Sequence, residues 1–179
     1  MKTAVIGIGN ILFMDEGVGV YAAKYLERNY AIDADIVDGG TLGFKLMRYY
    51  QEYDKVIIID TVSIEDDPGS IYNLPSDVLL GLGTYKKTAH EVEVVEMLEI
   101  CSLLENHAKV NIVGIVPADI ESVAIDLTPT LKLRFDALVA EVLAELRRDG
   151  VAYEKRGDES LESIIAAYAN PSAKELLWS

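Results

Sequence analysis

The fold is decided by residues 3–19, which read TAVIGIGNILFMDEGVG. The run over 3–8 is apolar and predicts a buried strand. Gly9 and Asn10 supply a turn, and apolar side chains at helical spacing follow over 16–29. Asp15 and Glu16 therefore stand between the carboxyl end of a buried strand and the start of a helix. Open α/β sheets bind their ligands at that position.

The composition narrows the class of protein. The chain has 179 residues, half of them apolar, which suffices for one domain that buries roughly 70% of the surface of its unfolded chain. No apolar run approaches the ~18 residues of a membrane helix. The first residues also lack the pattern of a signal peptide, so we expect a cytoplasmic protein.

Charge and cysteine content exclude further classes. The net charge of −14 argues against binding to nucleic acid or to anionic membranes, because both attract basic surfaces. Cys101 is the single cysteine, which excludes an internal disulfide and a cysteine-rich metal site. Its place on the apolar side of a predicted helix favours a buried small hydrophobic residue over a nucleophile.

Strand-like and helical runs alternate along the chain, which is typical of an α/β protein with a mostly parallel sheet. The predicted strands span 3–8, 34–38, 55–60, 70–74 and 110–116. The predicted helices span 16–29 and 42–50, begin at 90, and begin again after Thr128-Pro129. We expect the strand at 70–74 to be an antiparallel edge, because only a turn joins it to the strand before it.

The domain organisation follows from these runs. Residues 1–150 are expected to form one α/β domain. Residues 151–179 are more polar and are expected to form a loosely docked tail with a short helix near 161–168. No stretch of the sequence has the composition of a linker between two domains.

Acidic residues end or follow three of the predicted strands, so Glu16, Asp38 and Asp60 are expected to share the carboxyl end of the sheet. His90 follows a loop and opens a helix, from which its ring can face the same end. Two carboxylates and one imidazole suit a divalent ion such as nickel, zinc or iron. Because no thiolate is available, we expect an open or borrowed metal site. The simpler alternatives are a strand cap for Asp60 and a helix cap or surface residue for His90.

Two other functions fit the sequence less well. Gly7 and Gly9 after a strand resemble a dinucleotide fingerprint, but Leu12 occupies the third glycine position. A serine hydrolase would need a G-x-S-x-G elbow, which the sequence lacks.

Several motifs resemble those of the nickel-iron hydrogenase maturation endopeptidases. The opening signature is 7–12 with 15–19, and Asp38-Gly39-Gly40-Thr41-Leu42-Gly43 follows the second strand. The later motifs come in the family's order, namely Asp60-Thr61-Val62, Pro68-Gly69, Thr88-Ala89-His90-Glu91, Gly114-Ile115-Val116-Pro117 and Leu127-Thr128-Pro129. The resemblance covers roughly residues 3–146, and Thr88 stands where the family usually has serine.

The resemblance implies a three-layer α/β sandwich, with a twisted five-stranded sheet covered by helices on both faces. It also implies a cytoplasmic protease that removes the C-terminal extension of the hydrogenase large subunit after nickel insertion. The metal-contacting residues of the family correspond to Glu16, Asp60 and His90. Asp38 resembles a further acid that the family requires, so these four residues are the expected catalytic set.

In this family the nickel belongs to the substrate, so the resemblance implies no permanently bound cofactor. The implied partner is the precursor of a nickel-iron hydrogenase large subunit, and we expect the protein itself to be a monomer. The alternative from another class of protein is a non-catalytic α/β module. Such a module would bind a metal or the hydrogenase precursor without cleaving it.

Overall fold

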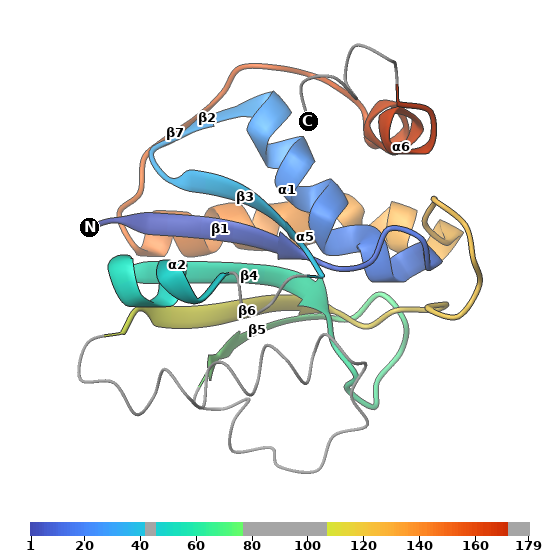
Figure 1. The fold of residues 1–179 in the computed structure, drawn as a ribbon, viewed down its shortest axis with the longest axis horizontal. Coiled ribbons are helices and arrows are strands. Elements are labelled where there is room, and N and C mark those ends of the chain that lie inside the picture. Colours follow the sequence, from blue (N-terminus) through green and yellow to red (C-terminus); the bar gives the residue numbers. More distant parts are fainter. Residues whose placement is uncertain (42–45, 77–106, 172–179) are drawn as a thin grey trace.

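A five-stranded sheet forms the middle of the molecule (Figure 1). The structure, a computed structural model, describes residues 1–41, 46–76 and 107–171. The strand order is β3-β1-β4-β6-β5. The bounds are β1 Thr3–Ile8, β3 Asp35–Gly40, β4 Lys55–Thr61, β6 Lys109–Ile115 and β5 Ile71–Pro75. β3, β1, β4 and β6 are parallel, and β5 is the predicted antiparallel edge. It pairs with β6, not with β4, the strand that precedes it in the chain.

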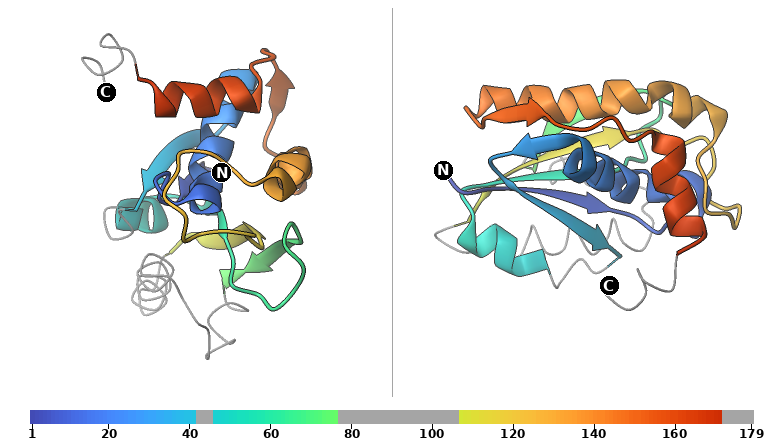
Figure 2. Two further views of the ribbon diagram at one scale, coloured as in Figure 1. Left: turned by 90° about the vertical axis from the view of Figure 1, so that its right-hand side faces the viewer. Right: turned by 90° about the horizontal axis from the view of Figure 1, so that it is seen from above.

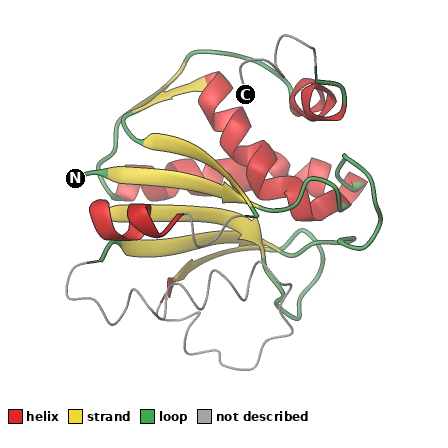
Figure 3. Cartoon of the chain, viewed as in Figure 1, coloured by secondary structure: helices red, strands yellow, loops and turns green. Residues whose placement is uncertain are grey.

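Helices cover both faces of this sheet, as Figures 2 and 3 show. α1 (Val18–Asn29) and α5 (Pro129–Arg148) lie on one face, and α2 (Met47–Glu52) lies on the other. Successive residues of a strand point to opposite faces. Ile57 and Ile59 of β4 accordingly pack in the core with α1 and α5, whereas Ile58 packs in the core that α2 covers. The predicted three-layer α/β fold is confirmed.

Several predicted boundaries change. The second strand extends two residues further than predicted, to Gly40. α2 begins at Met47, and residues 42–45 of the helix predicted over 42–50 lie outside the described residues. The helix predicted from His90, with Cys101, also lies outside them. β2 (Tyr30–Ile32) and β7 (Tyr153–Lys155) were missed, because three residues are too few to show an alternating pattern.

Residues 151–171, the part of the tail that the structure describes, are packed against the domain, so the expectation of a loosely docked tail was wrong for these residues. α6 (Leu161–Ala169) buries Ile164 and Ile165 in the core of α1 and α5. Upstream of α6, the side-chain amide of Asn29 donates to the backbone carbonyl of Glu159 at 3.0 Å, and its oxygen accepts from the Glu159 N–H at 2.6 Å. The predicted polarity was correct, but it describes only the outer face of an amphipathic helix.

Glycines bring the start of α1 directly onto the ends of two strands. A Cβ on Gly19 would collide with the backbone carbonyl oxygens of Ile59 in β4 and Ile8 in β1. Gly9, at φ 153°, lies equally close to the backbone carbonyl of Glu16. Glu16 belongs to η1, a single 3₁₀ turn over Met14–Gly17 that precedes α1. The depth at which Glu16 sits against the sheet therefore depends on glycine in these positions.

We expect Gly19→Ala to lower the free energy of unfolding by about 3 kcal/mol, because the added methyl meets rigid backbone. Urea denaturation measures this loss. The control is Gly150→Ala, where φ is 74° but the space around the glycine is open, so strain alone costs about 1 kcal/mol. Alanine is otherwise the better helix former, so a Gly19→Ala protein as stable as the wild type would contradict the close contact.

A buried ion-pair network joins α5 to the amino end of the sheet. The Lys55 ammonium in β4 lies 2.9 Å from Glu145 and 3.1 Å from Asp149, and it donates to Asn111 at 2.8 Å. Burial opposes ionisation of Glu145. Hydrogen bonds from Lys55, Arg148 and Asn73 outweigh it and lower the pKa of Glu145 to about 2.

Because the pKa of Glu145 falls below its ordinary 4.5, its contribution to stability is complete above pH 4.5 and lost as the pH falls through about 2. We expect Glu145→Gln to cost about 3 kcal/mol at pH 7, since Lys55 loses a buried partner. The difference from wild type should shrink steadily below pH 4.5 when urea midpoints are compared. A difference that stays constant down to pH 2 would show that the ionised carboxylate is not the source.

Candidate active site

Glu16 lies at the carboxyl edge of the sheet. The η1 turn that carries it contacts β4, and the residue is 8% exposed. Its position follows from the close packing of Gly9 against its backbone carbonyl. A carboxylate that is buried yet reachable from one side is suited to binding a cation, because the low-dielectric surroundings strengthen the attraction.

Asp60 lies near the carboxyl end of β4, the strand that η1 contacts. It is 4% exposed, and one carboxylate oxygen accepts a hydrogen bond from the Thr61 N–H at 2.7 Å. β4 is flanked by β1 and β6, so the backbone around Asp60 is fixed on both sides. The structure thus places Glu16 and Asp60 on two contacting elements, η1 and β4.

Asp38 reaches the same edge from the other face of the sheet. Gly7 of β1 pairs with both Asp38 and Ile59, and Ile59 packs on the α1 face. Asp60, one residue further along β4, points to the opposite face. The strands β3 and β4 are also separated by β1, a backbone spacing of about 10 Å. Asp38 is therefore not packed against Asp60.

His90 lies outside the described residues. Within residues 1–41, 46–76 and 107–171, no cluster of three or more histidine, cysteine, aspartate or glutamate side chains is arranged to hold a metal ion. Glu16 and Asp60 supply two oxygen ligands of the predicted set of three. The other histidine, His107, is exposed as predicted.

Asp15 is a structural residue of the site that the sequence analysis passed over. It is fully buried, and its carboxylate accepts four hydrogen bonds. The backbone N–H groups of Ala118 and Asp119 donate at 2.9 and 3.0 Å, and the N–H and hydroxyl of Thr128 donate at 2.8 and 2.9 Å. One side chain thus ties η1 to the loop before α5 and to the residue that caps α5. The signal available in the sequence was that Asp15 follows a run of apolar residues and precedes a second acidic residue, Glu16.

The loop over 117–127 borders the site on the η1 side. Phe13 forms a bridge with Ala124, whose N–H donates to Leu12 and whose carbonyl accepts from Met14, both at 3.0 Å. Leu12 and Val123, which are 50% and 78% exposed, lie on the two joined segments. The rim on the η1 side therefore carries two exposed apolar side chains, and backbone hydrogen bonds hold its two segments together.

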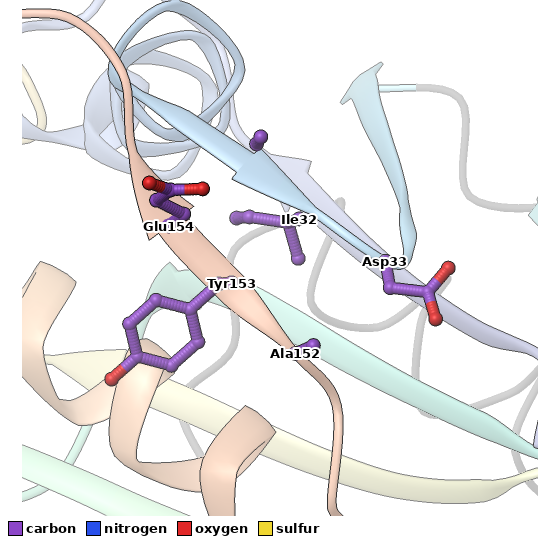
Figure 4. A pocket seen from close by; sticks show the side chains of 6 residues that line it. Ile32, Asp33, Ala152, Tyr153 and Glu154 are labelled. Atoms are coloured by element: carbon purple, nitrogen blue, oxygen red, sulfur yellow. The ribbon is translucent and has the colours of Figure 1, made fainter.

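Two hollows on the described surface lie away from these carboxylates. One, of about 470 Å³, is lined by residues of β2, β7 and their flanks, including Asp33 and Tyr153 (Figure 4). Asp33 precedes the start of β3, so this hollow lies at the opposite end of that strand from Asp38. The turn at Gly9 also leaves no room for a pyrophosphate, because the chain's own Glu16 carbonyl fills the space beside it. No described helix is long and apolar enough to cross a lipid bilayer.

Fold and site together define a three-layer α/β protein with buried carboxylates at the carboxyl edge of a parallel sheet. Comparison with known proteins identifies the family. The family model for hydrogenase maturation proteases matches residues 20–145. The hydrogenase 2 maturation protease of Escherichia coli is 34% identical over 155 residues, which are 84% of this chain and 94% of that protein. The hydrogenase expression/formation protein HupD of Bradyrhizobium diazoefficiens is also 34% identical, over 90% of this chain and 86% of its own.

The solved structures agree. The hydrogenase maturating endopeptidase HybD from E. coli superposes with a TM-score of 0.81 at 33% identity, covering 89% of this chain and all of that one. The chain belongs to the hydrogenase maturation protease family, as its motifs predicted, and it is a hydrolase that cleaves a peptide bond.

We expect Asp15→Asn to lower the free energy of unfolding by roughly 3 kcal/mol. The amide group that replaces one oxygen would face N–H and hydroxyl donors, which leaves buried donors unpaired. Urea denaturation measures the loss. Asp33→Asn, the same change at an exposed position, is the control and should stay within about 0.5 kcal/mol of wild type. Equal stabilities for the two variants would refute the anchoring role of Asp15.

Proposed function

We propose that this endopeptidase removes the C-terminal extension of a nickel-iron hydrogenase large-subunit precursor after nickel has been inserted, in the cytoplasm. The observation that carries the proposal is the pair of buried carboxylates, Glu16 and Asp60, on contacting elements at the carboxyl edge of the sheet. The pair lies in a fold shared with an E. coli hydrogenase maturating endopeptidase at 33% identity.

The donor chemistry supports recognition of a metal that arrives with the substrate. Carboxylates and imidazole bind first-row divalent ions at open positions, whereas thiolates hold such ions tightly. The chain has one cysteine, Cys101, so a thiolate cage must come from the precursor. In the proposed complex, Glu16, Asp60 and His90 contact the substrate's nickel, so that recognition of the precursor depends on the presence of the metal.

Contact with the substrate's nickel would also place the scissile peptide bond. A bound divalent ion can polarise a carbonyl or activate a water molecule. Residues that bind the ion also hold the scissile bond at a fixed distance from it. The rim that carries Leu12 and Val123 borders Glu16 and offers apolar contact to the precursor beside its metal. Asp38 points to the face of the sheet opposite to that of Asp60. We assign it to act on the peptide as a base or as an orienting group.

We expect the wild-type protein to release a C-terminal peptide from nickel-loaded precursor and to leave nickel-free precursor intact. Glu16→Gln and His90→Ala should slow release by more than about 100-fold, because each removes a ligand to the nickel. Mass spectrometry of the large subunit measures the cut. Glu154→Gln and His107→Ala, the same changes at exposed positions, are the matched controls and should process at the wild-type rate.

Two outcomes would correct the proposal. Cleavage that proceeds equally with and without nickel would retain the protease and discard metal recognition. Capture of the nickel-loaded precursor by wild-type protein, with no cleavage of any precursor, would instead indicate the binding-only module.

A further inference from the structure

Tyr168 connects the C-terminal helix to the candidate active site. It lies on α6, downstream of the residues 20–145 that the family model matches. Its hydroxyl donates to one carboxylate oxygen of Asp38 at 3.2 Å. The other oxygen of Asp38 accepts from the Gly40 N–H at 3.1 Å. Each oxygen of this exposed carboxylate thus has one donor among the described residues, and Tyr168 and Asp38 are 130 positions apart in the chain.

Packing against α1 holds the ring of Tyr168 in place. Its ring packs edge-on against Tyr21 of α1, with ring centroids 5.6 Å apart and an interplanar angle of 67°. On the same helix, Ile164 and Ile165 are buried, and the hydroxyl of Ser160 caps the first turn by accepting from the Ser163 N–H. Rotation of the ring away from Asp38 would disturb the packing of α6 on α1.

The direction of the hydrogen bond follows from the local electrostatics. Burial raises the pKa of the Tyr168 phenol, and the negative charge of Asp38 and the hydrogen bond to it raise it further. The phenol therefore stays protonated and acts as the donor at neutral pH. Glu27 and Tyr21 act on the phenol in the same direction.

We propose that Tyr168 is a positioning residue that holds the Asp38 carboxylate in its working orientation at the edge of the active site. This assignment rests on the proposed function, in which Asp38 acts on the peptide. Asp38 is on an edge strand and is exposed, so its side chain would otherwise rotate in solvent. Holding a reacting group in one orientation supplies part of the rate enhancement of an enzyme. Through Tyr168, α6 is thus part of the active site.

The test is Tyr168→Phe, which removes the hydroxyl and keeps the ring that packs on Tyr21. We expect kcat for processing of the nickel-loaded precursor to fall about tenfold, with KM within about twofold of wild type. Tyr153→Phe is the matched control, because the Tyr153 hydroxyl contacts Arg147 on α5, away from Asp38. It should leave both constants unchanged.

A cycle with Asp38→Asn separates positioning from a general effect on the fold. If Tyr168 acts through Asp38, adding Tyr168→Phe to Asp38→Asn should cause no further fall in kcat. An unchanged kcat in Tyr168→Phe, or an equal tenfold loss in both backgrounds, would overturn the assignment.

A second cycle needs no activity. The urea midpoints of the two single variants and the double variant should be non-additive, because the side chains contact each other in the folded protein. Additive shifts would overturn the contact and the positioning role, while the proposed function would stand. A wild-type protein that cleaves no precursor would overturn the proposed function, and with it the role of Tyr168, even when the midpoints are non-additive.

Discussion

The rest of the structure depends on the contact between the backbone of α1 and the carboxyl ends of β1 and β4. Gly19 lies so close to the carbonyl oxygens of Ile8 and Ile59 that no side chain fits between helix and sheet. This contact fixes where η1 runs, and so where Glu16 meets the edge of β4. A protein with a greater distance between α1 and the sheet could keep the same strand order, but its η1 turn would not bring Glu16 to the end of β4.

α5 adds the second constraint, because a side chain of η1 holds it near its start and a side chain of β4 holds it near its end. Near its start, Thr128 donates twice to the buried carboxylate of Asp15. Near its other end, Glu145 accepts from Lys55 of β4 at 2.9 Å. The helix therefore extends from the end of the sheet that carries the site to the opposite end. The loop over 117–127 leads into this helix and is anchored where Asp15 binds Thr128. Removing one partner of such a buried pair is destabilising, because it leaves the other charge uncompensated.

The sequence predicted the parts of the fold that repeat a simple pattern. Uninterrupted apolar runs identified β1, β4 and β6, and the Thr128-Pro129 start identified α5. Acidic residues at the predicted strand ends indicated Glu16 and Asp60 as candidates, and the motifs identified the family. Three features depend on tertiary structure and leave no local pattern. They are the pairing of β2 with β7, the hydrogen bonds to Asp15, and the face of the sheet on which Asp38 lies.

The contact between Asp38 and Tyr168 also has a consequence for the order in which the protein is made. Domains begin to fold from the N-terminus while the chain is still being synthesised. Glu16, Asp60 and the strands between them leave the ribosome first, together with Asp38. Asp38 acquires its second donor only after 130 more residues have been added. A nascent chain can therefore assemble the parallel sheet before the Asp38 carboxylate gains its contact with Tyr168, which the last described helix supplies.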